Sequence, residues 1–225
     1  MNIIFFSSLN PNDINNWSGT TWHILKALEK NNNVTVIGTH MLSQTAYFTS
    51  KSFSIKDVNE DYSPLFGSVC SELINRISDS DLIFFGDLQL SPYLDVDIPT
   101  IHISDVNYHL FKDYTNKNRT KEQEKRTEIK EKKVLKKYTI IIYSSEWTKQ
   151  NTIDYYKINP KKIQVVEFGA NIPHPEKWQH EIDTSVCNLV FIGRNWVKKG
   201  GEKVLGAYRK LKSEGFPCTL TIIGR

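Results

Sequence analysis

The sequence predicts an α/β protein built on a parallel sheet, followed by the beginning of a second unit of the same kind. Two observations predict this class. Short, continuous apolar runs, such as residues 3–6, 82–85 and 140–142, are typical of strands buried on both faces of a parallel sheet. Segments whose apolar residues recur at helical spacing separate these runs. Strand and helix therefore alternate along the chain, which indicates repeated βαβ units.

Composition narrows the classes of function. The chain has 225 residues, of which 39% are hydrophobic and 12% aromatic, as in a soluble globular protein of one large or two small domains. A net charge of +4 does not by itself indicate a nucleic-acid partner. The longest apolar run is far shorter than the roughly 20 residues of a membrane-spanning helix. Three cysteines without a CxxC pair fit reduced thiols rather than disulfides or a zinc site, and residues 1–6 carry no basic leader, so we expect a cytoplasmic protein without a signal peptide.

The first strand, residues 3–6, is followed by a polar loop that ends at Gly19. Ser18 or Thr20 could cap the next helix, which has apolar residues at 22, 24, 25 and 28 and precedes a strand at residues 34–37. Gly19 stands where the phosphate or sugar of a ligand could meet the amides of that helix. The alternative is a glycine that only serves a turn, since a dinucleotide-binding loop needs three glycines.

The middle of the chain predicts a helix at residues 65–77 and strands at residues 81–86 and 98–105, whereas residues 40–62 show no clear pattern. Ligands of open α/β sheets bind outside the carboxyl ends of the strands. His102 and Asp105, near the end of the second of these strands, are therefore the candidate catalytic residues of this half. The alternative for Asp105 is the cap of a following helix.

Residues 117–137 hold ten Lys or Arg and four Glu, a local excess of six positive charges (10 − 4). The Glu/Lys spacing predicts an exposed helix with ion pairs between residues four apart. Such a charged face is most often simply solvated. It could also contact an anionic membrane surface, where each basic residue contributes about 1 kcal/mol.

The remaining elements complete the first unit and begin the second. Strands are predicted at residues 138–143 and 163–166, with a helix between them that Ser144 or Ser145 caps and that ends near Tyr156. Residues 171–185 contain two prolines and few apolar residues, which predicts a linker. A strand at 188–192, a helix to about Lys212 and a strand at 219–223 follow. About forty residues are too few for an independent domain, so we expect the first βαβ unit of a larger one whose remainder is absent.

The loop between the strand and the helix of this second unit is a candidate anion site. It contains Arg194, Lys198 and Lys199 and ends in Gly200-Gly201, which lets the backbone approach a ligand closely. Backbone N–H groups at the start of a helix favour a negative charge. Such a loop suits a diphosphate. The alternative is an ordinary connection with solvated lysines.

Three stretches, residues 99–114, 138–171 and 190–201, together resemble the GT4-type retaining glycosyltransferases. The resemblance rests on the order and spacing of Ser-Ser-Glu-Trp at 144–147, Phe-Gly-Ala-Asn at 168–171 and Gly-Arg…Lys-Lys-Gly-Gly at 193–201. It implies the GT-B architecture, in which two Rossmann-like domains face a cleft. Residues 1–170 would form the acceptor-side domain, 171–185 the linker and 186–225 the start of the nucleotide-sugar-binding domain. The paired-glutamate motif of that second domain has no counterpart among the 225 residues.

By position, the resemblance assigns Arg194 and Lys199 to the donor diphosphate, with Lys198 as a neighbour, and places Gly19 in a loop that closes over the donor. Asp105 matches the residue beside the reacting sugar better than His102 does. The implied reaction moves a sugar, with retention, from a nucleoside diphosphate sugar to a glycan or lipid-linked acceptor. The implied setting is polysaccharide or lipopolysaccharide synthesis at the inner face of the plasma membrane. No Asp-x-Asp cluster follows a strand, so we expect neither a metal ion nor another cofactor, and no nucleic-acid partner.

Two other functions remain open. Another GT-B enzyme, such as a sugar-nucleotide epimerase, would act on the donor without an acceptor. A truncated, non-catalytic chain would instead bind a membrane or a partner through residues 117–137.

Overall fold

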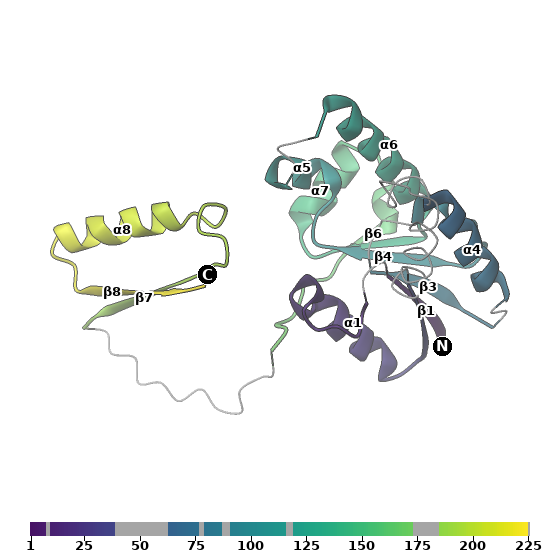
Figure 1. Ribbon diagram of the computed structural model, residues 1–225, viewed down its shortest axis with the longest axis horizontal. Coiled ribbons are helices and arrows are strands. Elements are labelled where there is room, and N and C mark those ends of the chain that lie inside the picture. The colour runs from purple at the N-terminus through teal and green to yellow at the C-terminus, as the bar shows by residue number, and fades with distance from the viewer. Residues whose placement is uncertain are drawn as a thin grey trace, which may run out of the picture. The chain divides into compact units, whose positions relative to one another are not determined.

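The computed structural model describes residues 1–7, 10–38, 63–76, 79–86, 91–115, 119–172 and 185–224. The chain divides into two compact units, Met1–Pro173 and His174–Arg225. The first unit combines several helices with a parallel sheet, and the described part of the second combines one helix with two parallel strands (Figure 1), so the predicted α/β class with a Rossmann-like first unit is confirmed. Residues 40–62, which showed no clear pattern, and most of the predicted linker lie outside the described residues.

The first unit is built on parallel strands in the order β2-β1-β3-β4-β5-β6. These strands are β1 (Asn2–Ser7), β2 (Asn33–Gly38), β3 (Leu82–Phe85), β4 (Thr100–Ser104), β5 (Ile140–Tyr143) and β6 (Ile163–Val165). Each of them coincides with an apolar run that predicted a strand. The register places Phe5 of β1 beside Val36 of β2 and Phe84 of β3.

Helices cover both faces of this sheet. They are α1 (Thr20–Glu29), α4 (Ser63–Arg76), α5 (Tyr108–Thr115), α6 (Lys121–Lys137) and α7 (Glu146–Asp154), with short 3-10 turns η1 (Asn16–Gly19), η2 (Ser91–Tyr93) and η3 (Pro160–Lys162). Figure 1 shows α1 on one side of the sheet and α4 and α6 on the other. Among the described helices, none is long and apolar enough to cross a bilayer.

Alternate residues of the strands supply two separate cores. Phe6 and Phe85 pack with residues of α4 and α6. The ring centroids of the two phenylalanines are 5.5 Å apart. Phe5 and Phe84 face the other way, stack at 5.6 Å and pack with Leu25 of α1. This arrangement explains the continuous apolar runs, because both faces of each central strand are buried. Each fully buried Phe side chain contributes about 1.5–3 kcal/mol to folding.

The charged segment forms α6, but this helix is exposed on one side only. Val134, Leu135 and Glu131 are buried. Glu122 forms a pair with Arg126 at 2.6 Å, as the four-residue spacing predicted. The predicted exposed helix with ion pairs is thus confirmed for the outer side of α6, whereas its inner side packs on the sheet.

The second unit is a single βαβ arrangement. It consists of β7 (Cys187–Ile192), α8 (Gly201–Ser213) and β8 (Cys218–Ile223), and the two strands are parallel neighbours. These elements match the three that the sequence predicted. Phe191 is buried, whereas Val190 and Ile192, on the other face of β7, are 59% and 72% exposed.

Candidate functional site

The strand order of the first unit indicates where a ligand would bind. Strand β2 lies on one side of β1, and β3 lies on the other. In open α/β sheets, ligands bind at such a reversal, outside the carboxyl ends of the strands. Here those ends are Ser7 and Phe85, and the N–H of the next residue, Gly86, donates to the carbonyl of Phe6 at 3.0 Å. The loop between β1 and α1 leaves from this edge.

This loop ends in three consecutive residues with positive φ, namely Trp17 (46°), Ser18 (54°) and Gly19 (85°). A residue other than glycine loses about 1–3 kcal/mol in such a conformation. Backbone strain of this kind persists only where surrounding contacts hold it, and it gathers at ligand sites and active sites. The Trp17–Gly19 loop is therefore a candidate binding loop at the edge where the strand order predicts a ligand.

Gly19 is the N-cap of α1 and lies at the start of this helix, as the sequence predicted. The prediction that Ser18 or Thr20 caps the helix is wrong, because no side chain caps it. A Cβ atom on Gly19 would meet neighbours at ordinary contact distances of 3.5 Å, so its backbone conformation rather than lack of space favours glycine. An uncapped helix start suits an anion.

Asp105 lies directly after β4, at the same edge of the sheet, and its side chain is exposed. Its carbonyl oxygen accepts a hydrogen bond from the Thr148 hydroxyl at 2.8 Å. The cap of α5 is a different residue, Asn107, whose side-chain oxygen accepts from the Leu110 N–H at 3.1 Å. The alternative of Asp105 as a helix cap is thus wrong, and its carboxylate faces solvent at the carboxyl edge.

His102 does not reach this edge. Its ring is 1% exposed and stacks on the Tyr138 ring, with centroids 5.0 Å apart. Burial lowers the pKa of His102 to about 3, so the ring is neutral at physiological pH. The prediction of His102 as a catalytic residue is contradicted, because its strand position turns the ring into the core.

Glu131 of α6 joins three helices in the interior of the first unit. Its two carboxylate oxygens accept the N–H of Tyr108, the first residue of α5, at 2.9 and 3.0 Å. The hydroxyl of Tyr156, just beyond α7, also donates to Glu131. Burial raises the pKa of Glu131 to about 7, although the hydrogen bonds act in the opposite direction. Glu131 thereby fixes the start of the helix that follows Asp105.

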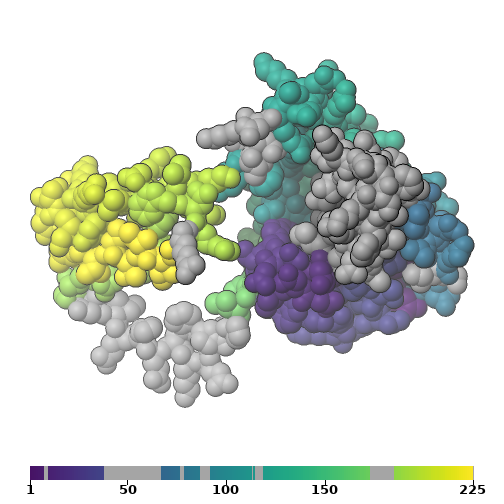
Figure 2. Space-filling model, viewed as in Figure 1, coloured from purple at the N-terminus to yellow at the C-terminus, as the bar shows by residue number. Residues whose placement is uncertain are grey.

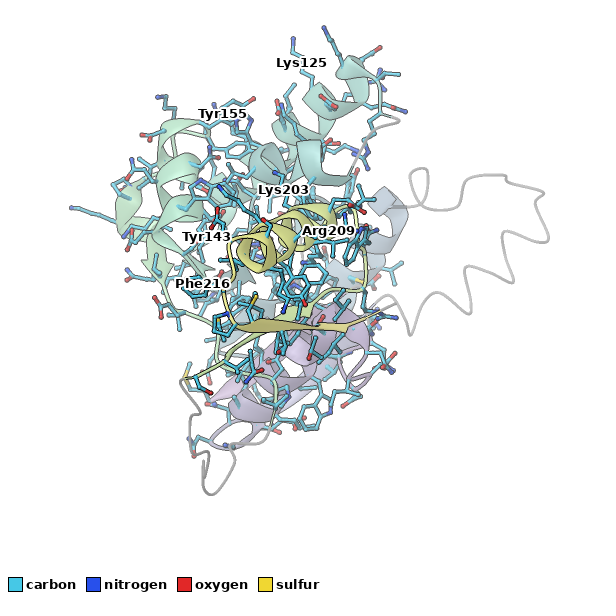
Figure 3. All side chains as sticks on the ribbon, turned by 90° about the vertical axis from the view of Figure 1, so that its left-hand side faces the viewer. Lys125, Tyr143, Tyr155, Lys203, Arg209 and Phe216 are labelled. Carbon is cyan, nitrogen blue, oxygen red and sulfur yellow. The ribbon has the colours of Figure 1, made fainter. Side chains whose placement is uncertain are left out.

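Glu128, one turn earlier on α6, is the centre of a second cluster of polar side chains. It accepts from Lys112 Nζ at 2.9 Å and from the Tyr155 hydroxyl at 2.7 Å, and His109 Nδ1 lies 3.5 Å away. Burial acts to raise the pKa of Glu128, but the hydrogen bonds from Tyr155, Lys112 and His109 outweigh it and lower the pKa. Figure 3 labels Tyr155. Sequence reasoning missed both glutamates, because each lies within a charge run that looks solvated.

The basic loop of the second unit connects β7 to α8. Arg194, Lys198 and Lys199 are exposed on it. Gly200 has φ +77°, and a Cβ atom on Gly201 would lie 2.1 Å from the Trp196 ring, so neither position suits another residue. The indole of Trp196 also donates to Glu202 Oε1 at 2.7 Å. The loop is thus a packed turn that presents three cationic side chains.

The backbone of this loop departs from the prediction. Four consecutive N–H groups, from Lys198 to Gly201, donate to acceptors within the loop itself. The N–H groups of Lys199 and Gly201, for example, donate to the carbonyls of Asn195 and Trp196 at 2.9 and 2.8 Å. We expected these N–H groups to point toward a ligand, but they point toward acceptors within the loop. An anion at this loop would be held mainly by the side chains.

A cavity of about 470 Å³ opens at the opposite, amino end of β4. Its lining includes Asp95, Asp97 and Lys137 around Phe85 and Tyr138. None of the predicted site residues lines this cavity, so it is separate from the edge described above.

Comparison with known proteins identifies no family. No family model and no curated protein matches the chain. Among solved structures, the Arabidopsis thaliana protein UGT89C1 complexed with UDP-L-rhamnose is 13% identical with a TM-score of 0.41, over 85% of this chain and 57% of that one. The substrate-binding protein CD0873 of Clostridium difficile is 13% identical with a TM-score of 0.30, over 100% of this chain and 58% of that one. The chain thus spans less than two thirds of either structure, and neither likeness identifies a function.

Proposed function

We propose that this chain is part of a glycosyltransferase that uses a nucleoside diphosphate sugar, with two Rossmann-like domains in the GT-B manner. The observation that carries the proposal is the β7–α8 loop, where Arg194, Lys198 and Lys199 stand exposed at the carboxyl end of a parallel strand. Three cations beside a helix start suit a diphosphate. The GT4-type motifs at residues 144–147, 168–171 and 193–201 support the same class.

In this proposal the bond between the sugar and the diphosphate breaks, and a bond from the acceptor oxygen forms on the same face of the sugar. The acceptor proton passes to an oxygen of the leaving phosphate. Arg194 offers a fork to two phosphate oxygens and Lys199 a point charge, so both stabilise the negative charge that grows on the leaving group. Asp105 is the proposed catalytic carboxylate beside the reacting sugar. The proposed acceptor is a glycan or lipid-linked acceptor in the synthesis of cell-surface polysaccharide or lipopolysaccharide.

Calorimetric titration with UDP-glucose and GDP-mannose tests the proposal. We expect the chain to bind one of these donors, and to bind it more weakly as salt concentration rises, because the contacts are ionic. Absence of heat with both donors, in protein whose folding circular dichroism confirms, would contradict the proposal. Conversion of the bound sugar without any acceptor would favour an epimerase instead.

The outer face of α6 supports a membrane contact as a second proposal. Seven basic side chains of this helix are exposed, against a single exposed acid, Glu122; these bases are Lys121, Lys125, Arg126, Lys130, Lys133, Lys136 and Lys137. The other three glutamates of this helix are partly or fully buried, so most of the charge on its exposed face is positive. Ile129 stands among the bases and is 59% exposed. A basic face around an apolar residue suits an anionic lipid surface. Figure 2 shows the outer end of this helix standing out from the first unit, and Figure 3 shows Lys125 there.

We expect the protein to sediment with vesicles that contain phosphatidylglycerol and not with neutral phosphatidylcholine vesicles. The double variant Lys125→Glu/Lys133→Glu should lose most of this binding, since each basic residue contributes about 1 kcal/mol. The matched control, Lys203→Glu/Lys212→Glu on α8, makes the same change of charge and should bind as the parent does. Equal binding of the two double variants would reject the α6 contact.

A further inference from the structure

The Trp17–Gly19 loop requires outside support for its conformation. Trp17 and Ser18 are not glycine, yet both have positive φ, which is uncommon for residues with a side chain. The following residue, Thr20, begins α1 and is buried. Within the loop itself, the N–H of Thr20 donates to the Trp17 carbonyl, a contact that any tight turn would make. A tertiary contact must therefore select this conformation over the ordinary right-handed one.

Asn171 supplies that contact. Its side-chain nitrogen donates to the carbonyl oxygen of Ser18 at 3.0 Å and to the hydroxyl oxygen of Thr20 at 2.9 Å. The two acceptors bracket Gly19, so one amide group spans the left-handed turn. A primary amide has two N–H donors on one atom, which a carboxylate lacks. Phe168, three residues earlier, adds a ring contact with Trp17 at 5.5 Å between centroids.

Asn171 and the Trp17–Gly19 loop follow strands that are far apart in the sheet. Residues 166–171 follow β6, the edge strand, whereas the loop follows β1, and three strands (β3, β4 and β5) lie between them. The segment thus runs back along the sheet to the place where the strand order reverses. Beyond this segment the chain continues toward the second unit. One side chain therefore ties the predicted ligand edge to the segment that leaves the first unit.

We propose that Asn171 is a positioning residue that holds the Trp17–Gly19 loop in its left-handed conformation and so sets the place of the loop at the ligand edge. The effect on a ligand rests on the proposed function, in which that ligand is the nucleoside diphosphate sugar. The effect on the loop does not. The two can therefore be measured separately.

The loop is measured by the fluorine resonance of Trp17 in protein labelled with 5-fluorotryptophan, assigned by its loss in Trp17→Phe. Asn171→Ala should shift this resonance at every pH. Asn171→Asp has the same shape but cannot donate to the Ser18 carbonyl while it is ionised, so it should also shift the resonance at about pH 8. At about pH 5 a growing fraction of the carboxyl group is protonated and can donate, because an Asp that faces oxygen acceptors titrates above its usual pKa of roughly 3.9. The resonance of Asn171→Asp should then move back toward the parent position, and that of Asn171→Ala should not.

The matched control is Asn31→Asp, which makes the same change of charge at an exposed position just beyond the end of α1. Its Trp17 resonance should equal that of the parent protein at both pH values. A Trp17 resonance that stays unchanged in both Asn171 variants would overturn the proposal. Equal shifts of Asn171→Asp at the two pH values would overturn the role of the donated hydrogen bonds.

The ligand is measured by calorimetry with UDP-glucose and GDP-mannose. Loss of the hydrogen bonds from Asn171 should raise the Kd of the sugar nucleotide that binds by about fivefold for each hydrogen bond lost. For Asn171→Asp, the Kd should fall back part of the way toward the parent value at lower pH. An unchanged Kd together with a shifted Trp17 resonance would reject an effect of Asn171 on binding of the sugar nucleotide, while its role in holding the Trp17–Gly19 loop would stand. If the parent protein binds neither sugar nucleotide, the proposed function fails, and the fluorine spectra alone test whether Asn171 holds the Trp17–Gly19 loop.

Discussion

Replacing Arg194 with alanine is expected to lower donor turnover more than tenfold, and Lys199→Ala should do the same. Preorganised cationic or donor groups that meet a growing negative charge commonly account for about 3–4 kcal/mol of the barrier in a dry site. Both residues are exposed on the β7–α8 loop, where the N–H groups of residues 198–201 are already used within the loop. The side chains therefore carry most of the contact with a diphosphate, and losing either should be costly. Release of nucleoside diphosphate from the sugar nucleotide measures the effect.

Two further variants sharpen this test. Arg194→Lys keeps the charge but loses the planar fork, so its turnover should lie between those of the parent and of Arg194→Ala. Arg209→Ala removes an exposed arginine further along α8 and should leave turnover unchanged; Figure 3 labels this residue. Turnover near the parent value in Arg194→Ala and Lys199→Ala would remove these residues from the diphosphate site.

Replacing Glu131 with alanine is expected to destabilise the first unit by about 3 kcal/mol, because it leaves one buried and one partly buried donor without an acceptor. These donors are the N–H of Tyr108 and the hydroxyl of Tyr156. Glu122→Ala on the same helix removes an exposed acid that pairs with the exposed Arg126 and should change stability by less than about 0.5 kcal/mol. Urea unfolding followed by circular dichroism measures both variants. Similar stabilities of the two would show that Glu131 has no such role.

The same carboxyl group should make stability depend on pH. Its pKa is about 7 in the folded protein and about 4.5 as an ordinary glutamate, so the folded state keeps a proton that the unfolded state loses between these values. Stability from this group is therefore fully present below about pH 4.5, falls as pH rises, and is lost above about pH 7, a change on the order of 3 kcal/mol. Glu131→Gln cannot titrate, so the difference in unfolding free energy between it and the parent should vary over this window. A constant difference would show that Glu131 keeps an ordinary pKa.

The sequence alone was sufficient for the strands and for most of the helices of the described parts, whereas α5 and the 3-10 turns were not predicted from it. Strands β1, β3 and β5 appear as unbroken apolar runs because helices cover both faces of the sheet, and burial on two faces leaves no place for polar residues. The position of Gly19 at the start of α1 and the βαβ order of the second unit follow from the same local patterns. The positions of Arg194 and Lys199 on the β7–α8 loop could also be predicted, because they depend only on neighbours in the chain.

Contacts between distant residues were decided by the tertiary structure alone. His102 and Asp105 are three residues apart, yet one turns into the core and the other faces solvent, because His102 lies within β4, whose faces are both covered, and Asp105 lies just beyond the end of that strand. Glu131 belongs to a charge run that looks solvated, and only the packing of α5 and α7 against α6 buries it. Asn171 reaches Ser18 across 153 positions of sequence. Local patterns report which face of an element is buried, but the path of the chain determines which side chains meet at the predicted ligand edge.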